Sequence, residues 1–125
     1  MKFERFSEAV KILGDRTRLR LIRLLMERPV FVCEASAVLG LSTPTVSVHF
    51  SKLKQFGFVK DRKEGQKVMY SLAEPPDPCL KLVLEGVLQY LRTSDEFDED
   101  IERLKSVDIS KVCPYEGGNS EEENA

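Results

Sequence analysis

The sequence lacks several features on which whole classes of protein depend. No apolar run approaches the roughly 18 residues that a membrane-spanning helix needs, and residues 1–5 do not begin a signal peptide. We therefore expect no membrane association and a cytoplasmic location. The chain has one histidine, His49, and neither a glycine-rich phosphate loop nor a paired-carboxylate pattern. Because a nucleophilic Cys33 with His49 as its base would have no evident group to orient the histidine, we expect a protein that is not an enzyme.

Cysteine is also scarce. Cys33, Cys79 and Cys113 are an odd number of cysteines at wide spacings. In a reducing compartment such spacing is typical of free thiols rather than of a disulfide framework. Any site that uses these thiols together must be assembled by the fold or by a dimer.

The small net charge of −2 conceals an asymmetry along the chain. Residues 1–72 carry 14 basic and 7 acidic side chains, whereas residues 73–125 carry 5 basic and 14 acidic ones. A basic body joined to an acidic region is typical of a protein that faces a polyanion with one part of its surface. We therefore expect the first 72 residues to contact nucleic acid with an affinity that falls steeply with salt.

Hydrophobic spacing predicts a mainly α-helical domain with one β-hairpin. Gly14, Pro29, Gly40 and Gly57 mark the ends of the first four predicted helices. Apolar side chains cover most of the circumference of residues 78–92, which predicts burial on two sides and hence a subunit interface. The predicted helices span residues 3–13, 16–28, 33–39, 43–56, 78–92 and 95–106, and the predicted strands span residues 58–62 and 66–72.

Two regions follow from this pattern. Residues 1–107 form the predicted DNA-binding and dimerisation domain. Residues 108–125 form a C-terminal tail, which holds Cys113 as a candidate site residue and which we expect to be disordered from Gly117 onward.

Two short predicted helices joined by residues 40–42 and followed by a basic hairpin have the layout of a winged helix-turn-helix. A helix that enters the major groove needs one apolar face, one face of small polar side chains, and flanking cations for phosphates. Simple solvation is the alternative role for each hydroxyl residue, and packing is the alternative for His49. The residues predicted to contact DNA are Thr43, Thr45, Ser47, His49, Ser51 and Lys52 on the helix, and Arg62, Lys63 and Lys67 on the hairpin.

Three segments resemble the ArsR/SmtB family of metal-responsive repressors. They are residues 13–22 (LGDRTRLRLI), 39–50 (LGLSTPTVSVHF) and 61–72 (DRKEGQKVMYSL), and the likeness covers roughly residues 3–92. The resemblance implies a homodimer of winged-helix subunits, joined by their first and last helices, that binds a palindromic operator and releases it when an inducer binds. Residues 72–78 and the later acidic helix resemble the arsenic-responsive branch in particular.

The chain departs from the family at its metal sites. Members often sense soft ions through a Cys-Val-Cys sequence before the recognition helix, whereas this chain has Phe31-Val32-Cys33 and keeps only the second thiol. A second family site, on the last dimer helix, uses Asp and His ligands. No histidine follows His49, so we do not expect zinc there.

The cysteines nevertheless indicate a soft inducer. Trivalent arsenic favours thiolate sulfur and commonly takes three such ligands, and Cys33, Cys79 and Cys113 supply that number. We therefore predict arsenite or antimonite as the inducer and no required cofactor. Cys33 lies near a predicted helix N-terminus, which favours its thiolate, and Cys113 could close over Cys33 of its own or the other subunit. Inducer binding would then pull the third helix and weaken the operator complex.

Other interpretations stay open. Packing is the alternative role for Cys79, and the cysteines could instead form a redox or persulfide switch in which two thiols join on oxidation. Arg16, Arg18 and Arg20 could contact phosphates or form salt bridges within a dimer. A protein-interaction module built on the acidic tail would predict no salt-dependent DNA affinity.

Overall fold

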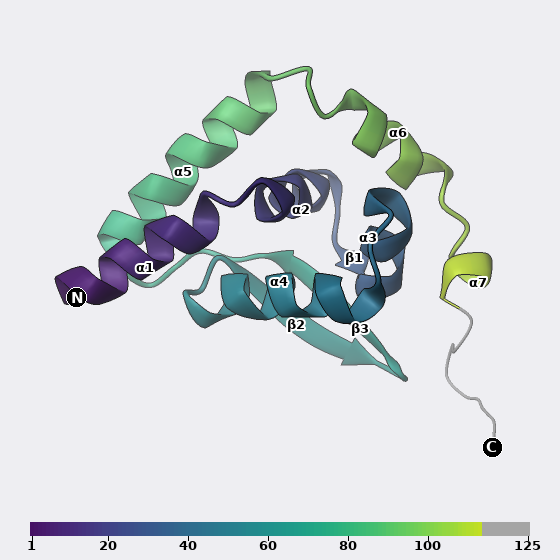
Figure 1. The fold of residues 1–125 in the computed structure, drawn as a ribbon, viewed down its shortest axis with the longest axis horizontal. Coiled ribbons are helices and arrows are strands. Elements are labelled where there is room, and N and C mark those ends of the chain that lie inside the picture. Colours follow the sequence, from purple (N-terminus) through teal and green to yellow (C-terminus); the bar gives the residue numbers. More distant parts are fainter. Residues whose placement is uncertain (114–125) are drawn as a thin grey trace.

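Helices and one small sheet make up residues 1–113, the part of the chain that the computed structural model describes (Figure 1). Helices pack against one side of the sheet, and its hairpin projects away from the rest of the molecule. In chain order the elements are α1 (Phe3–Leu13), α2 (Arg16–Glu27), β1 (Val30–Phe31), α3 (Val32–Leu39), α4 (Thr43–Gln55), β2 (Val59–Glu64), β3 (Lys67–Leu72), α5 (Pro78–Thr93), α6 (Asp98–Ser106) and α7 (Ile109–Val112).

Side-chain caps fix where the central helices begin. The carboxylate of Asp15 accepts a hydrogen bond from the backbone N–H of Arg18 at 3.0 Å and starts α2. The hydroxyl of Ser42 accepts one from the backbone N–H of Thr45 at 3.3 Å and starts α4. Between them α3 ends at Gly40, whose φ of 71° lies in the left-handed region that favours glycine. The predicted turn between the two short helices is therefore confirmed.

The sheet contains one strand that the sequence pattern did not predict. Its order is β1-β3-β2 with both pairings antiparallel, and β1 pairs Val30 with Tyr70. A two-residue strand carries too few residues for an alternating pattern, so it gives no sequence signature. The predicted hairpin is confirmed, although its strands are shifted by one or two residues because the turn lies at Gly65 and Gln66.

The core lies between the helices and the inner face of the sheet. Phe50 of α4 stacks on Tyr70 of β3 with ring centroids 4.2 Å apart, so α4 is held directly against the hairpin. The residues of the core with no exposed surface are Ala9, Leu21, Ile22, Leu24, Val30, Ala35, Val46, Phe50, Leu53 and Phe58.

The C-terminal helices differ from the sequence prediction. Helix α6 begins at Asp98 rather than at residue 95, because residues 94–97 form a turn in which the Ser94 hydroxyl accepts from the backbone N–H of Glu96. Helix α7 was not predicted, and its start is capped by Asp108, whose carboxylate accepts from the backbone N–H of Ser110 at 3.0 Å. The prediction of disorder from Gly117 onward falls outside the described residues.

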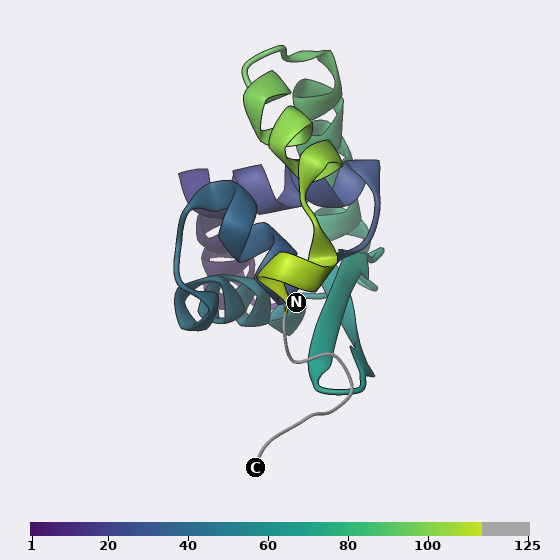
Figure 2. The ribbon, with the colours of Figure 1, turned by 90° about the vertical axis from the view of Figure 1, so that its right-hand side faces the viewer.

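Helix α7 and the start of helix α5 lie at opposite ends of the molecule. Figures 1 and 2 place α7 beside α3 and close to the hairpin, whereas the start of α5 lies at the far end beside α1. None of the helices within residues 1–113 is both long and apolar enough to cross a bilayer.

Candidate DNA-binding surface and thiol pair

Helix α4 has the two faces that the sequence predicts. Val46, Phe50 and Leu53 have no exposed surface and fix the helix on the core. The opposite face carries small and basic side chains at the outside of the molecule. Thr43, Thr45, Ser51 and Lys52 are exposed, and Ser47 is half-buried.

The hairpin carries the three predicted cations along its two strands. Arg62 and Lys63 are exposed on β2, and Arg62 forms an ion pair with Glu64. Lys67 opens β3, and its ammonium lies 4.5 Å from the centroid of the Phe31 ring. All three predicted cations therefore lie on the hairpin that follows α4 in the chain.

His49 lies on the inward edge of α4 rather than with the exposed residues. Its Nδ1 accepts a hydrogen bond from a guanidinium nitrogen of Arg18 at 2.9 Å, since arginine carries only donors. Burial and the positive charge of Arg18 lower the pKa of His49. The geometry accordingly matches the packing alternative that the sequence left open for this residue.

Arg18 is the buried partner that organises this region, and sequence reasoning did not assign it that role. It is 8% exposed, and its Nε donates to the carbonyl of Ile12 at 2.6 Å. The pKa of Asp15 is lowered: partial burial works against this, but the Arg18 backbone N–H and the Arg18 charge outweigh it. Arg20 pairs within the subunit as well, with both oxygens of Asp100 at 2.9 Å.

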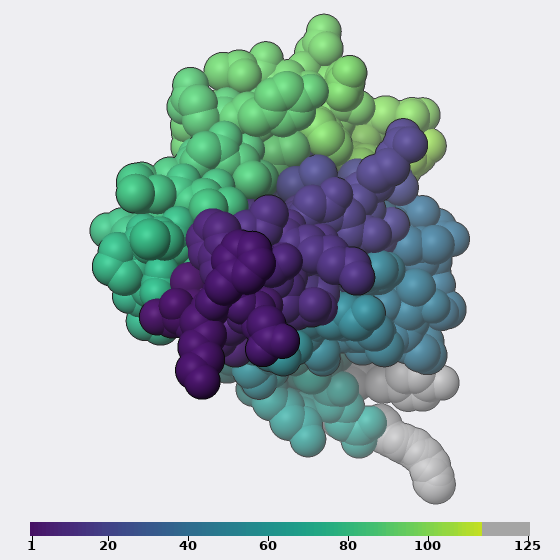
Figure 3. Space-filling view, turned by 60° about the vertical axis from the view of Figure 1, so that its left-hand side comes forward, coloured from purple at the N-terminus to yellow at the C-terminus, as the bar shows by residue number. Residues whose placement is uncertain are grey.

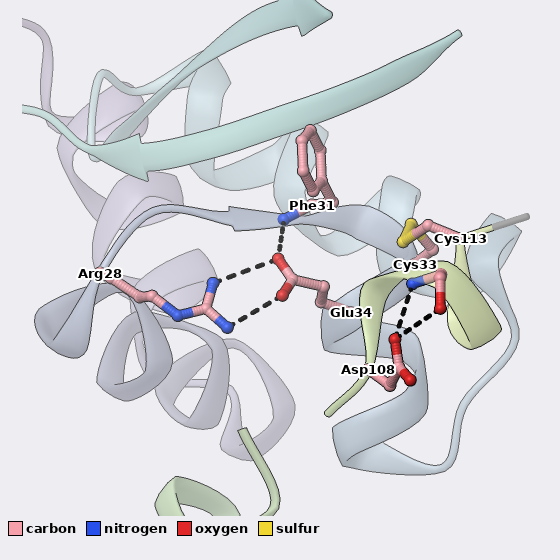
Figure 4. The surroundings of a disulfide bond; sticks show 7 residues. Arg28, Phe31, Cys33, Glu34, Asp108 and Cys113 are labelled. Atoms are coloured by element: carbon pink, nitrogen blue, oxygen red, sulfur yellow. Dashed lines mark hydrogen bonds and ion pairs between the residues drawn. A yellow bond between two sulfur atoms is a disulfide. The ribbon is translucent and has the colours of Figure 1, made fainter. Parts of the chain in front are cut away.

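The fold brings two of the three cysteines together. Cys33, in the first turn of α3, and Cys113, directly after α7, form a disulfide across 80 residues of chain, with Cα atoms 5.4 Å apart (Figure 4). The expectation that all three cysteines are free thiols was wrong for this pair. It failed because widely spaced cysteines can meet when the chain returns, here through α6 and α7.

Cys79 does not join this pair. It is exposed in the first turn of α5, where Asp77 accepts hydrogen bonds from its backbone N–H and that of Leu80. Helix α5 packs on α1 and α2, whereas α7 packs on α3. The predicted set of three thiols therefore does not form within one subunit, and no group of three His, Cys, Asp or Glu side chains in residues 1–113 could hold a metal ion.

A buried carboxylate positions Cys33. Glu34 has no exposed surface, accepts from the backbone N–H of Phe31 at 2.9 Å, and pairs through both oxygens with Arg28 (Figure 4). These bonds fix the junction between β1 and α3, and Cys33 lies in the first turn of that helix. Sequence reasoning missed Glu34, although a glutamate three residues after a helix start is typical of this kind of cap.

A pocket of about 280 Å³ joins the thiol pair to the predicted DNA-binding surface. Both cysteines line it, and so do Thr43 and Ser47 from the outer side of α4. The hairpin and the valines of α3, β3 and α7 complete the wall. The full lining is Val32, Cys33, Thr43, Ser47, Gln66, Lys67, Val68, Val112 and Cys113.

The fold and this surface define a winged helix-turn-helix, the architecture of DNA-binding transcriptional regulators rather than of enzymes. Residues 15–61 match the family described as "Bacterial regulatory protein, arsR family". The chain is 39% identical over 74 residues to an uncharacterised HTH-type regulator of Methanocaldococcus jannaschii, covering 58% of this chain and 83% of that protein. This protein belongs to the arsR family of DNA-binding transcriptional repressors.

Other relatives carry more specific names. The arsenic resistance regulator ArsR1 of Pseudomonas putida is 37% identical over 62% of each chain. A cadmium resistance regulator, the CadC homologue of Staphylococcus aureus, is 39% identical over 69% of each chain.

Solved structures agree on the fold. Reduced HlyU of Vibrio cholerae is 30% identical, with a TM-score of 0.55 over 73% of this chain and 95% of that one. The homodimeric winged helix-turn-helix domain of Mb0332 from Mycobacterium bovis shares the fold at 22% identity, with a TM-score of 0.57 over 74% of this chain and 82% of that one.

Proposed function

We propose that the protein is a homodimeric repressor that holds a palindromic operator with α4 and the hairpin, and that a change at the Cys33 and Cys113 pair releases the operator. One observation carries this proposal. The two cysteines line the same pocket as Thr43 and Ser47, which belong to the predicted DNA-binding face. A change in how the sulfurs are joined therefore acts directly beside the recognition helix.

The DNA side of the proposal rests on the exposed face of α4. Its hydroxyl residues are small enough to approach base edges in the major groove, and Lys52 stands beside them for phosphate contact. Arg62, Lys63 and Lys67 of the hairpin would follow the backbone on the flank. His49, held by Arg18, would contribute mainly by fixing the helix, since its Nδ1 is already occupied.

The proposal of a homodimer rests on large apolar side chains that are exposed in the single subunit. Phe3 of α1 is 81% exposed, and Leu82 and Tyr90 of α5 are 67% and 58% exposed. Helices α1 and α5 lie side by side on one face of the molecule (Figure 3). Exposed side chains of this size on adjacent helices indicate an interface, and a two-fold dimer through this face would present two α4 helices to two operator half-sites.

Oxidation of the thiol pair by a peroxide is the inducing event that the geometry favours: the two thiols give up two electrons and two protons as the sulfur–sulfur bond forms, and these reduce hydrogen peroxide to two water molecules. The bonded sulfurs fasten α7 to α3, and α3 packs directly on α4. Reduction frees α7 from this link, so the two states differ beside the recognition helix. A coupling free energy of about 1 to 3 kcal/mol would change operator affinity about 5- to 150-fold. With a polysulfide as the oxidant, the two thiols would instead join through one additional sulfur atom, and a second sulfur of the polysulfide would leave as hydrogen sulfide.

Trivalent arsenic is the second candidate inducer, and the pairing of two sulfurs favours it. Arsenite, As(OH)₃, would exchange two hydroxyl groups for the thiols of reduced Cys33 and Cys113 and release two water molecules. This binding again joins α3 to the segment after α7. The name of the P. putida relative, an arsenic resistance regulator, supports the same inducer.

Operator affinity in three states tests the proposal. We expect the reduced protein to bind operator DNA tightly, and the disulfide and arsenite-loaded forms to bind at least 5-fold more weakly. Cys33→Ser should bind DNA like the reduced protein and respond to neither treatment, whereas Cys79→Ser should respond as the wild type does. An undiminished response in Cys33→Ser would refute the role of the pair, and intact mass separates loss of two hydrogens from arsenic or sulfur addition.

A further inference from the structure

One apolar side chain lies in the middle of the predicted DNA-binding face of α4. We propose that Val48 contacts the C5-methyl group of a thymine in the major groove, and that it selects thymine at one position of each operator half-site. The inference deepens the proposed function, because it rests on α4 as the helix that reads the operator. It does not depend on the thiol pair.

Val48 is an exposed apolar residue that the proposed dimer does not explain. The large apolar side chains that are exposed in residues 1–113 are Met1, Phe3, Val10, Val48, Leu82 and Tyr90. All of them except Val48 lie at the start of the chain, on α1 or on α5. Val48 is 54% exposed and lies on α4. A single exposed valine needs no explanation on an ordinary surface, so the inference rests on where this one lies.

The buried neighbours of Val48 in α4 determine the direction in which it faces. Residues two positions apart lie about 200° apart around an α-helix of 3.6 residues per turn. Val46 and Phe50, two residues before and two residues after Val48, have no exposed surface and belong to the core. Val48 therefore faces away from the core, on the side of the helix that would enter the groove.

The exposed neighbours of Val48 are residues predicted to contact DNA. Thr45, Ser51 and Lys52 lie at the three- and four-residue spacings that make side chains adjacent on a helix, and all three are exposed. Val48 thus lies between hydroxyl groups suited to base edges and an ammonium suited to a phosphate. Contact of these groups with DNA would also bury Val48, which removes its apolar surface from water.

Thymine is the base whose major-groove edge suits a valine. Thymine presents its C5-methyl group there, whereas cytosine presents an amino donor, and the purines present polar groups. Valine cannot accept a hydrogen bond, so a cytosine amino group placed against it would lose a bond to water. Valine also has one strongly preferred χ1 rotamer in a helix, so holding its methyl groups in place costs little entropy. We therefore expect thymine in preference to the other three bases at this position.

Replacement of thymine by uracil isolates the contact. The reduced full-length protein first selects duplexes from a random-sequence DNA pool, and the enriched sequence is the probe. Each thymine of that duplex is then replaced in turn by deoxyuridine, which removes only the C5-methyl group, and fluorescence anisotropy gives each affinity. We expect one position in each half-site at which binding weakens about 3- to 5-fold, and about 10- to 25-fold when both are replaced, from the burial of one methyl group at each.

Two variants assign the effect to Val48. Val48→Ser removes both methyl groups at a similar helix propensity, so it should bind the thymine and uracil duplexes equally, with the affinity of the wild type for the uracil duplex. Its thermal unfolding should stay close to that of the wild type, because the side chain is exposed. Lys52→Gln is the matched control from the same face, since loss of a phosphate contact should weaken binding to both duplexes by the same factor.

Three results would overturn the inference: no thymine whose replacement weakens binding, a thymine preference that survives Val48→Ser, or undiminished affinity of Val48→Ser for the thymine duplex. The thiol switch is scored separately, from the affinities of the reduced and oxidised protein for the same duplex. Equal affinities of those two forms would count against the proposed function alone. A pool from which no duplex is enriched would overturn both.

Discussion

Arg18 of α2 and His49 of α4 are joined by a hydrogen bond of 2.9 Å between a guanidinium nitrogen and Nδ1. The bond requires an unprotonated Nδ1, because a protonated ring would set two donors and two positive charges against each other. The recognition helix is therefore connected to the core of the subunit through a titratable group whose pKa is lowered by burial and by the Arg18 charge.

This contact predicts a pH dependence of stability. Burial and the Arg18 charge lower the pKa of folded His49 below 6.5, so between that lower value and 6.5 the unfolded chain binds more protons than the folded one. The stabilisation is complete above pH 6.5 and is lost as the pH falls toward the folded pKa. Urea unfolding across this range should show a fall in the free energy of unfolding that His49→Gln, which cannot titrate, lacks. Parallel curves for the two proteins would contradict the assignment.

The ion pair between Arg20 and Asp100 should stabilise α6 on α2. Both oxygens of Asp100 accept from Arg20 at 2.9 Å, and its side chain is 9% exposed. We expect Asp100→Ala to lower the free energy of unfolding by about 1 to 2 kcal/mol, with allowance for the partly exposed arginine. Glu99→Ala is the control, since Glu99 pairs with Arg103 in solvent and should cost under about 1 kcal/mol. Equal losses in the free energy of unfolding for Asp100→Ala and Glu99→Ala would show that the pair with Arg20 does not hold α6 on α2.

Gly57 and Gly40 allow the cost of a positive φ to be separated from the cost of a steric clash with a new Cβ. Both have positive φ, 82° and 71°, but a Cβ on Gly57 would lie 3.1 Å from Pro76 Cδ and 3.3 Å from Pro75 Cα, whereas one on Gly40 meets nothing within 4 Å. Gly40→Ala should cost about 1 kcal/mol from strain alone. Gly57→Ala should cost roughly 1 to 2 kcal/mol more in the same thermal or urea unfolding experiment. A larger loss in the free energy of unfolding for Gly40→Ala than for Gly57→Ala would show that the contacts with Pro75 and Pro76 do not add to the cost.

Phosphate contacts predict the salt dependence of operator binding. Lys52→Gln and Lys63→Gln should each weaken binding to specific and random DNA alike, and each should reduce the slope of log affinity against log salt by about 1. Lys105→Gln on α6 should leave the slope unchanged, since Lys105 is exposed on a helix outside the predicted DNA surface. Fluorescence anisotropy at several salt concentrations gives the slopes. A slope unaffected by both substitutions would remove these lysines from the interface.

The position of Cys79 predicts the stoichiometry of arsenite. Because only Cys33 and Cys113 meet within the subunit, reduced protein should bind one equivalent of arsenite per subunit, and Cys79→Ser should bind the same amount. Titration with detection of free thiols by mass spectrometry checks both. Protection of Cys79 by arsenite would mean that a third sulfur reaches the site, and would restore the three-thiol arrangement.

The helices and the hairpin could be predicted from the sequence because their signals are local. Asp15 and Ser42 cap helices within three residues of themselves, and Gly40 ends α3 through its own φ. The apolar spacing of Val46, Phe50 and Leu53 similarly determined the inner face of α4, and with it which side chains face outward. Strand β1 and helix α7 escaped prediction because they are too short to carry a period.

The sequence by itself determined the architecture of this protein and which side chains of α4 face outward. Only the tertiary structure decided how the dispersed polar and sulfur groups combine: Cys33 with Cys113 rather than with Cys79, Arg18 with His49, and Arg20 with Asp100. The physical reason is distance along the chain. Capping and periodicity act over a few residues, whereas these pairs are separated by 80, 31 and 80 residues. They meet only because α4 and α6 pack on α2, and α7 packs on α3.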